Sequence, residues 1–543
     1  MLSLQSVAYT HPNRDILFSD IDLVVSRHEK LALIGNNGVG KSTMLRLMAG
    51  ELQPSAGVVQ ADPKPWYVPQ LAGQLNSHTV AQALRIDRKL DALHRIIAGD
   101  VSAENLRLLD DDWALEERCH EAFSLWGIGG ITPSQQMESL SGGQKTKVLL
   151  AGIMIHDAAT VLLDEPSNHL DTSGRELLYQ YIMSTKNTLV VVSHDRTLLD
   201  LLDKVAELSR RGITIHGGNY DFYLEQKGTA SEALSQDIRS QEKALRKARE
   251  TEREAMQRQQ KLDARGKKRQ EKAGLPTISM NTFRNNAEKS TARMKDVHTE
   301  KIGSIEQQLG QLRKELPDKD RMRLDFDDST LHTGKVLVAL NDVNFAYGSR
   351  LLWQQPLNLS ILSGQRLAIK GANGSGKTTL IRMILGELSP SMGAISRADL
   401  NAIYIDQDYS LINNHSGGGH GPGDDQSPSP LTVVEQAQSF NTGGLQEHEI
   451  RNRLSRFLFG PGHWDKPCAA LSGGEKMRLC LCCLTIAAKS PDMIILDEPT
   501  NNLDIQNIEI LTAAINEYKG TLLVVSHDER FLKEVGIHLD HFL

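Results

Sequence analysis

Short runs of consecutive apolar residues, most of them followed directly by a glycine or by an acidic or hydroxyl residue, are the clearest pattern along the chain. They lie at 31–34, 161–163 and 189–192, and again at 367–369, 494–496 and 522–525. Unbroken apolar runs of this length are typical of strands in a parallel sheet that is covered on both faces. Apolar residues at helical spacing follow, for example at 44–48. The pattern therefore predicts an α/β fold.

The second half of the chain repeats the first. The matching landmarks, in the same order, are Gln70 with Gln407, Ser141 with Ser472, Asp164 with Asp497 and His194 with His527. The offset between partners stays between 331 and 337 residues, so the pattern predicts a duplicated domain.

A glycine-rich loop follows the apolar run at 31–34, and another follows the run at 367–369. The two loops consist of Gly35, Asn36, Asn37, Gly38, Val39, Gly40, Lys41, Ser42 and Thr43, and of Gly371, Ala372, Asn373, Gly374, Ser375, Gly376, Lys377, Thr378 and Thr379. Between a strand and a helix, such a P-loop cradles phosphate oxygens with its backbone N–H groups. Lys41 and Lys377 are expected to reach the β- and γ-phosphates, and Ser42 and Thr378 to bind Mg²⁺. The expected ligand is a nucleoside triphosphate.

A pair of carboxylates follows one buried strand in each half. Asp164 and Asp497 are expected to hold Mg²⁺ through water, and Glu165 and Glu498 to polarise the water that attacks the γ-phosphate. The alternative is a pair of solvated strand ends, which the nearby P-loops make less attractive.

Two further polar residues recur at strand ends. His194 and His527 follow apolar strands and are candidates to sense the γ-phosphate, although a histidine in this place is often structural. Gln70 and Gln407 follow short aromatic strands, and their neutral amides could orient water or the metal ion.

A second helix N-terminus with glycines completes each half. Its residues are Ser141, Gly142 and Gly143 in the first half and Ser472, Gly473 and Gly474 in the second. With this LSGG signature the sequence resembles the ATP-binding-cassette superfamily, because the P-loop, glutamine loop, signature, Asp-Glu pair, D-loop and switch histidine occur in that order in both halves.

That resemblance implies an ATPase whose two cassettes pair head to tail. ATP at Lys41 would then meet Ser472 and Gly474, and ATP at Lys377 would meet Ser141 and Gly143. Because both glutamates are present, two competent sites are expected. Tyr347 is the expected adenine-stacking residue of the second half, while Tyr9 and His11 both remain candidates in the first.

The segment between the cassettes has a different composition, rich in Lys, Arg, Glu and Gln. It predicts helices at about 231–272 and 285–316, with a break carrying apolar residues at 273–283, and therefore a helical hairpin. Residues 261–295 contain ten basic and three acidic residues, a net charge of +7. The whole chain carries −7, so the remainder carries −14. A solvated coiled coil is the plainer interpretation, but concentrated positive charge favours contact with a phosphate backbone.

Residues 216–223, HGGNYDFY, come just before this hairpin and resemble the end of the first cassette in the ABC-F family. The expected domains are a first cassette at 1–223, a basic hairpin linker at 224–320 and a second cassette at 321–543. The resemblance implies a ribosome-binding ATPase at the exit site, whose linker approaches the P-site tRNA and the peptidyl-transferase centre, in translation regulation or antibiotic protection. Intramolecular pairing of the cassettes implies a monomer.

Two other functions remain open, the ATPase subunit of a membrane transporter and a DNA-associated ATPase, since arginine and lysine contacts do not distinguish RNA from DNA. Five cysteines, an odd number in a long chain, favour reduced thiols and a cytoplasmic location. No apolar run is long enough to span a bilayer. The glutamine loop and signature are 71 and 65 residues apart in the two halves, so neither half is expected to hold an additional arm. Residues 413–430 are a low-complexity insert.

Overall fold

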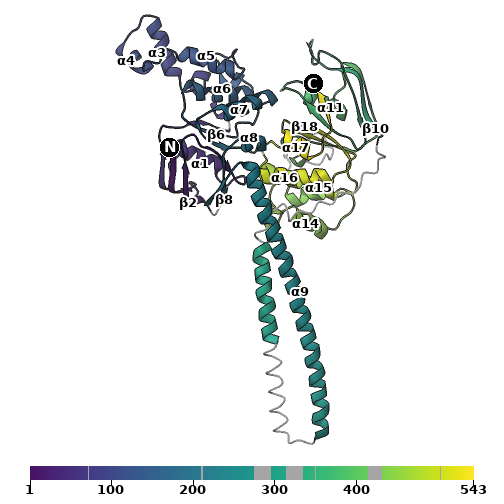
Figure 1. Cartoon of the computed structure of the whole chain (residues 1–543). Helices are drawn as coiled ribbons and strands as arrows, with labels where there is room; N and C mark the ends of the chain where they lie inside the picture. The colour runs from purple at the N-terminus through teal and green to yellow at the C-terminus, as the bar shows by residue number, and fades with distance from the viewer. Residues whose placement is uncertain are drawn as a thin grey trace, which may run out of the picture. The chain divides into compact units, whose positions relative to one another are not determined.

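A computed structural model describes residues 1–70, 72–209, 212–273, 295–313, 334–348, 350–372, 374–413, 431–501 and 503–543. The chain forms two compact units, one made of Met1–Tyr223 with Met322–Leu543 and the other of Leu224–Arg321 (Figure 1). Several predicted features lie outside the described residues. They are Asn373 of the second P-loop, the hairpin tip at 274–283, the basic residues at 284–293, and the insert at 414–430.

A mostly parallel sheet forms the centre of the first cassette, with strand order β5-β6-β7-β3-β8-β9. Its strands are β3 (Lys30–Ile34), β5 (Trp66–Val68), β6 (Thr160–Asp164), β7 (Thr188–Val192), β8 (Lys204–Ser209) and β9 (Gly212–Gly217). The strands β6 and β7 are buried throughout, as their apolar runs predict. Only the pairing of β9 with β8 is antiparallel.

The first cassette also contains helices. They are α1 (Lys41–Met48), α2 (Val80–Ala83), α3 (Asp87–Ile97), α4 (Ala103–Leu109), α5 (Leu115–Leu125), α6 (Gly142–Ile155), α7 (Thr172–Ser184) and α8 (Arg196–Asp200), with 3-10 turns η1 (Ala72–Leu75) and η2 (Met137–Ser139). A separate antiparallel sheet has the order β2-β1-β4 and consists of β1 (Leu2–Thr10), β2 (Ile16–Val25) and β4 (Ala56–Ala61).

The second cassette repeats this plan with a parallel sheet of order β16-β17-β18-β14-β19. Its strands are β14 (Arg366–Lys370), β16 (Ala402–Ile405), β17 (Met493–Asp497), β18 (Thr521–Val525) and β19 (Leu539–Phe542). Its antiparallel sheet β13-β10-β15 consists of β10 (Val336–Asn344), β13 (Leu357–Leu362) and β15 (Met392–Arg397), next to a small hairpin of β11 (Ala346–Tyr347) and β12 (Arg350–Leu351).

The helices of the second cassette are α11 (Lys377–Leu385), α12 (Ser410–Asn413), α13 (Val433–Ser439), α14 (Glu447–Arg456), α15 (Gly473–Ile486), α16 (Ile505–Glu517) and α17 (Glu529–Glu534), with 3-10 turns η4 (Pro461–His463) and η5 (Cys468–Ala470). Buried Cys480, Cys482 and Cys483 of α15 belong to one apolar core together with β17 and β18. The predicted α/β fold with two cassettes is confirmed.

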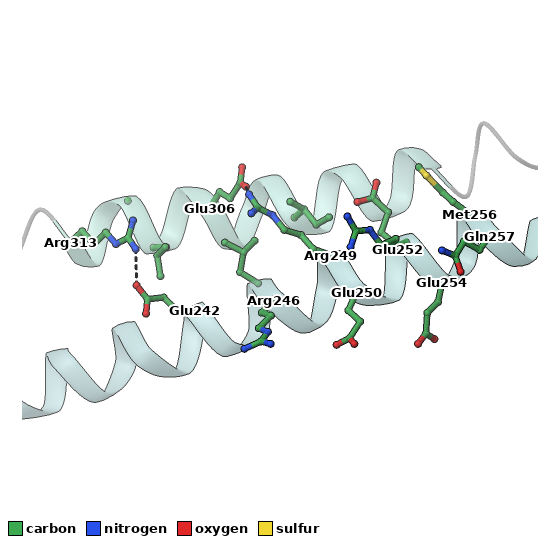
Figure 2. Close-up of a pocket in the computed structure, with 15 residues that line it drawn as sticks. Glu242, Arg246, Arg249, Glu250, Glu252, Glu254, Met256, Gln257, Glu306 and Arg313 are labelled. Carbon is green, nitrogen blue, oxygen red and sulfur yellow. Dashed lines mark hydrogen bonds and ion pairs between the residues drawn. The ribbon is translucent and has the colours of Figure 1, made fainter. Parts of the chain in front are cut away.

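The hairpin begins with the long helix α9 (Tyr220–Ala273), which starts about ten residues earlier than predicted, and residues 295–313 form helix on the return. Two ion pairs join these helices, Arg249 to Glu306 and Arg313 to Glu242, each with N–O distances of 2.6 Å (Figure 2). They fix the register of the predicted hairpin. Among the described residues, no helix is both long and apolar enough to cross a membrane.

Candidate ATP sites

Each P-loop lies between a central strand and a helix, as the sequence predicts. The Nζ atom of Lys41 donates to the carbonyl oxygens of Gly35 and Asn36 at 2.6 and 3.2 Å. Lys377 makes the same two contacts, to Gly371 at 2.8 Å and to Ala372 at 3.2 Å. The lysine thus spans its own loop and encloses the space beneath the backbone N–H groups.

The residue before each of these helices has a backbone conformation that suits glycine. Gly40 and Gly376 are the N-cap residues of α1 and α11, with φ of 106° and 97°. A Cβ atom at Gly40 would lie 2.7 Å from the side chain of Leu17, and one at Gly376 would lie 2.5 Å from Leu352. Neither cap residue supplies a side chain, so the helix N-terminus stays open to an anion.

An aspartate stands at the end of the buried strand in both halves. Tyr67 donates its hydroxyl to Asp164 at 3.1 Å, and Tyr404 donates to Asp497 at 3.0 Å. The hydroxyl of Thr378 also donates to Asp497 at 3.3 Å. Sequence analysis does not single out these tyrosines, although both occupy the same place in the repeated aromatic strand.

The same corner suits a small hard cation. Carboxylate and hydroxyl oxygens, from Asp164 with Ser42 and from Asp497 with Thr378, are the ligand type that Mg²⁺ prefers. The second oxygen of Asp164 is buried without a hydrogen-bond partner in the described part of the chain. An unpaired buried carboxylate oxygen costs free energy that a cation would recover. The residues present therefore fit Mg²⁺.

The glutamates after these aspartates are held in an unusual backbone conformation. Glu165 and Glu498 have φ of 51° and 49°, in the left-handed region that non-glycine residues rarely adopt. Their backbone N–H groups donate to Val192 and Val525 at 2.8 Å, which stabilises this bend. Burial raises the pKa of both carboxyls, that of Glu498 to about 7, where Arg175 and Lys377 oppose the rise. A raised pKa suits a group that exchanges protons near neutrality.

A histidine lies against each glutamate. The Nε2 atom of His194 is 3.2 Å from Glu165, and Nε2 of His527 is 3.3 Å from Glu498. Burial lowers the pKa of His194 to about 3 and that of His527 to about 4, so both imidazoles are neutral near pH 7. A neutral imidazole can donate one hydrogen bond and accept another.

The glutamine loop lies beside the aspartate in the first half. A cavity of about 530 Å³ is lined by Gln70, Ser42 and Asp164, among others. Gln407 lies two residues after the end of β16, at the corresponding place in the second half.

The signature serines cap their helices. Ser141 accepts a hydrogen bond from the backbone N–H of Gln144, and Ser472 accepts one from that of Glu475. The glycines allow close packing, since a Cβ atom at Gly143 would lie 2.7 Å from the carbonyl oxygen of His169 and one at Gly474 would lie 2.1 Å from Asn507. Gly142 and Gly473 begin α6 and α15.

Residues from opposite cassettes meet at the first P-loop and at the switch histidine of the second cassette. The backbone N–H of Asn37 donates to Asp504 of the second cassette at 3.2 Å. Thr172 of the first cassette lies 3.1 Å from Nδ1 of His527. One contact thus reaches the first P-loop, and the other reaches the switch histidine of the second cassette.

Aromatic residues lie near the strand pairs that precede the P-loops. Tyr347 is 62% exposed and its hydroxyl lies 3.1 Å from that of Thr379. Tyr9 packs against the core of the first cassette, as Phe345 does in the second. His11 is therefore the structural counterpart of Tyr347.

The sequence pattern of the ABC transporter family matches residues 18–168 and 354–501, which contain both P-loops and both Asp-Glu pairs. Relatives with paired cassettes match nearly the whole chain, linker included. The chain is a tandem ABC ATPase of the ABC-F type. This ABC-F protein is 30% identical to the tylosin resistance ATP-binding protein TlrC of Streptomyces fradiae, over 99% of this chain and 97% of that protein.

Other relatives of this ABC-F protein match nearly the whole of this chain but only about three quarters of their own length. ABC transporter F family member 5 of Arabidopsis thaliana is 29% identical, covering 98% of this chain and 74% of that protein. The ATP-binding protein Uup of Escherichia coli K12 is 28% identical, covering 95% and 76%. Among solved structures, the archaeal ribosome recycling factor aABCE1 shares the fold with a TM-score of 0.59 at 19% identity, over 98% of this chain and 86% of that one.

Proposed function

We propose that this ABC-F ATPase binds the ribosome in its ATP-bound state and uses the hairpin to approach the P-site tRNA and the peptidyl-transferase centre in the cytoplasm. The observation that carries the proposal is the concentration of charge. Residues 261–295 carry +7 in a chain whose remainder carries −14, and residues 261–273 form the last turns of the helix α9. An acidic body with one basic extension suits a partner whose backbone is phosphate.

The proposed chemistry assigns one task to each residue of a site. Lys41 and Lys377 bind the β- and γ-phosphates together with the loop N–H groups. Glu165 and Glu498 orient and polarise water, and His194 and His527 hold the γ-phosphate through the imidazole. Ser42, Asp164 and Gln70, and Thr378, Asp497 and Gln407, would hold Mg²⁺, which when bound would offset phosphate charge. The signatures at 141–143 and 472–474 would close each site from the opposite cassette.

Sedimentation through a sucrose cushion tests ribosome binding. A variant with Glu165→Gln and Glu498→Gln should accumulate with ATP, because hydrolysis is blocked, and should pellet with 70S ribosomes. The same variant without nucleotide is the control. A protein that stays in the supernatant with ATP would refute ribosome binding, and stimulation of ATP hydrolysis by DNA alone would favour the DNA-associated alternative.

A matched pair of charge variants tests the role of the basic end. Lys261 and Arg265 are exposed near the far end of α9, while Lys243 and Lys247 are exposed on its earlier part. Changing Lys261 and Arg265 to Gln should weaken ribosome binding several-fold and reduce its salt dependence by roughly two counterions. The control, with Gln at 243 and 247, removes the same charge and should bind nearly as well. Equal losses would show that only total charge matters.

Antibiotic protection is the cellular role that we favour, because a relative with 30% identity over nearly the whole chain is named for tylosin resistance. Deleting the gene should make the host more sensitive to a macrolide such as tylosin. Shortening residues 274–283 should have the same effect while ATP hydrolysis continues. Unchanged drug sensitivity in the deletion strain would exclude protection and leave a role in translation.

A further inference from the structure

The two ATP sites differ at the position that contacts the switch histidine of the second site. In the second site, Oγ1 of Thr172 lies 3.1 Å from Nδ1 of His527. Thr172 is the first residue of α7 in the first cassette, directly after its N-cap Asp171. The contact therefore joins a helix of one cassette to the catalytic region of the other.

The corresponding position at the first site is apolar. Asp504 is the N-cap of α16 and contacts the first P-loop through Asn37, so the beginning of α16 lies beside the first site. The first residue of α16 is Ile505, which has no side-chain donor. The Nδ1 atom of His194 is buried there, and no hydrogen-bond partner is found for it in the part of the chain that the structure describes.

The hydroxyl of Thr172 is the hydrogen-bond partner that the structure gives to the ring of His527. Its Nε2 atom is 3.3 Å from the carboxyl group of Glu498, but no hydrogen-bond partner is found for Nε2 among the described residues. A hydroxyl both donates and accepts, so Thr172 can pair with Nδ1 in either tautomer of the ring. This one hydrogen bond restrains the rotation of the His527 imidazole. His194 has its Nε2 atom 3.2 Å from Glu165 and no such partner at Nδ1 in the described part of the chain.

We propose that Thr172 is a positioning residue for His527, and that the site containing Lys377 is therefore better prepared for hydrolysis than the site containing Lys41. The inference rests on the catalytic roles assigned above to the glutamates and histidines. It makes the second site depend on the first cassette for the orientation of its own histidine, whereas the first site lacks this support from Ile505.

Single-site backgrounds separate the two activities. Glu165→Gln leaves the second site active, and Glu498→Gln leaves the first. In the Glu165→Gln background, Thr172→Val should lower kcat about three- to tenfold, the effect of one neutral hydrogen bond, with KM for ATP nearly unchanged. Thr172→Ser keeps the hydroxyl and should restore kcat to within about twofold. In the Glu498→Gln background, Thr172→Val should have no effect.

A gain-of-function variant guards against an effect of misfolding. Ile505→Thr in the Glu498→Gln background offers His194 the missing hydroxyl and should raise kcat of the first site several-fold. The proposal is overturned if Thr172→Val leaves the second site unchanged, if it lowers both sites equally, if serine does not rescue, or if Ile505→Thr gives no gain. Full ATP hydrolysis by the Glu165→Gln, Glu498→Gln double variant would instead refute the assigned catalytic roles, whatever Thr172 does.

Discussion

Arg196 gives the most direct test of how the two cassettes are held together. It lies in α8 of the first cassette, its side chain is only 4% exposed, and its Nη1 atom lies 2.9 and 2.7 Å from the two carboxylate oxygens of Glu534 in α17 of the second. Nη2 is 3.9 Å from Asp528, and no hydrogen-bond partner is found for Nη2 or Nε among the described residues. The guanidinium is thus buried, and Glu534 provides most of the hydrogen bonding and negative charge that offset the cost of burying it.

The magnitude follows from this geometry. Breaking a fully buried pair from one side costs about 3–5 kcal/mol, and an exposed pair contributes about 0–1 kcal/mol. Because the side chain of Glu534 is 35% exposed, we expect a coupling free energy of about 2 kcal/mol between Arg196 and Glu534. Glu534→Gln should cost more than Arg196→Met, since it leaves the buried guanidinium uncompensated whereas methionine removes it. Arg530 lies 3.4 Å from Glu534 and can still pair with it when Arg196 is replaced. The measured coupling is therefore a lower bound on the strength of the pair between Arg196 and Glu534.

A double-mutant cycle measures this coupling. The cycle uses the hydrolysis-blocked Glu165→Gln, Glu498→Gln protein and adds Arg196→Met, Glu534→Gln or both. The quantity compared is the concentration of a fluorescent ATP analogue that half-saturates each variant. Each ATP is expected to need residues from both cassettes, so a loss of about 2 kcal/mol raises half-saturation by up to about 30-fold. Lys204→Met is the control, because its partner Glu29, at 3.1 Å, lies in the same cassette. Single effects that add to within about 0.3 kcal/mol would refute the reasoning.

Two further predictions concern the sites themselves. Burial raises the pKa of Glu498 to about 7 and Arg175 opposes that rise, so Arg175→Met should raise it further. Because the base must be ionised, the acidic limb of kcat in the Glu165→Gln background should then move to higher pH by about one unit, while the Glu498→Gln background shows no such shift. An acidic limb that stays at the same pH would show that Arg175 does not influence the pKa of Glu498. Tyr404→Phe and Tyr67→Phe each remove a hydroxyl that orients an aspartate, and should raise the Mg²⁺ concentration for half-maximal ATP hydrolysis about tenfold. Unchanged Mg²⁺ dependence would assign these tyrosines to packing.

The fold could be predicted because its signals are local and occur twice. Buried strands such as β6 and β17 are continuous apolar runs, and the P-loops lie between a strand and a helix by sequence order alone. The start of α9 was missed by about ten residues because Tyr220, Phe222 and Tyr223 look unlike the charged helix that they begin. Burial of Tyr220 and Tyr223 explains the difference, since their rings pack at 5.8 Å while the helix continues beyond them.

The intervals between the glutamine loop and the signature, 71 and 65 residues long, are filled differently in the two halves. In the first half, α3 and α4 fill the space between α2 and α5, whereas only residues 440–446 separate α13 from α14 in the second. The two lengths agree because the second interval contains the insert at 413–430. Length alone does not distinguish a folded pair of helices from a glycine- and proline-rich insert, but composition does.

The residues that join the cassettes were not predictable, because pairing across an interface leaves no local signal. Comparing the halves nevertheless explains them. Residues assigned to chemistry are nearly the same at positions 333 apart, as in Glu165 with Glu498 and His194 with His527. The residues that join the cassettes differ at matched positions, since Thr172, Arg175 and Arg196 correspond to Ile505, Ile508 and Glu529. Two copies on separate chains would face each other through identical surfaces. Two copies in one chain are free of that constraint, so each interface position can change alone. A residue that differs between matched positions is therefore a candidate for a one-sided contact, and Arg196 with Glu534 and Thr172 with His527 are such contacts.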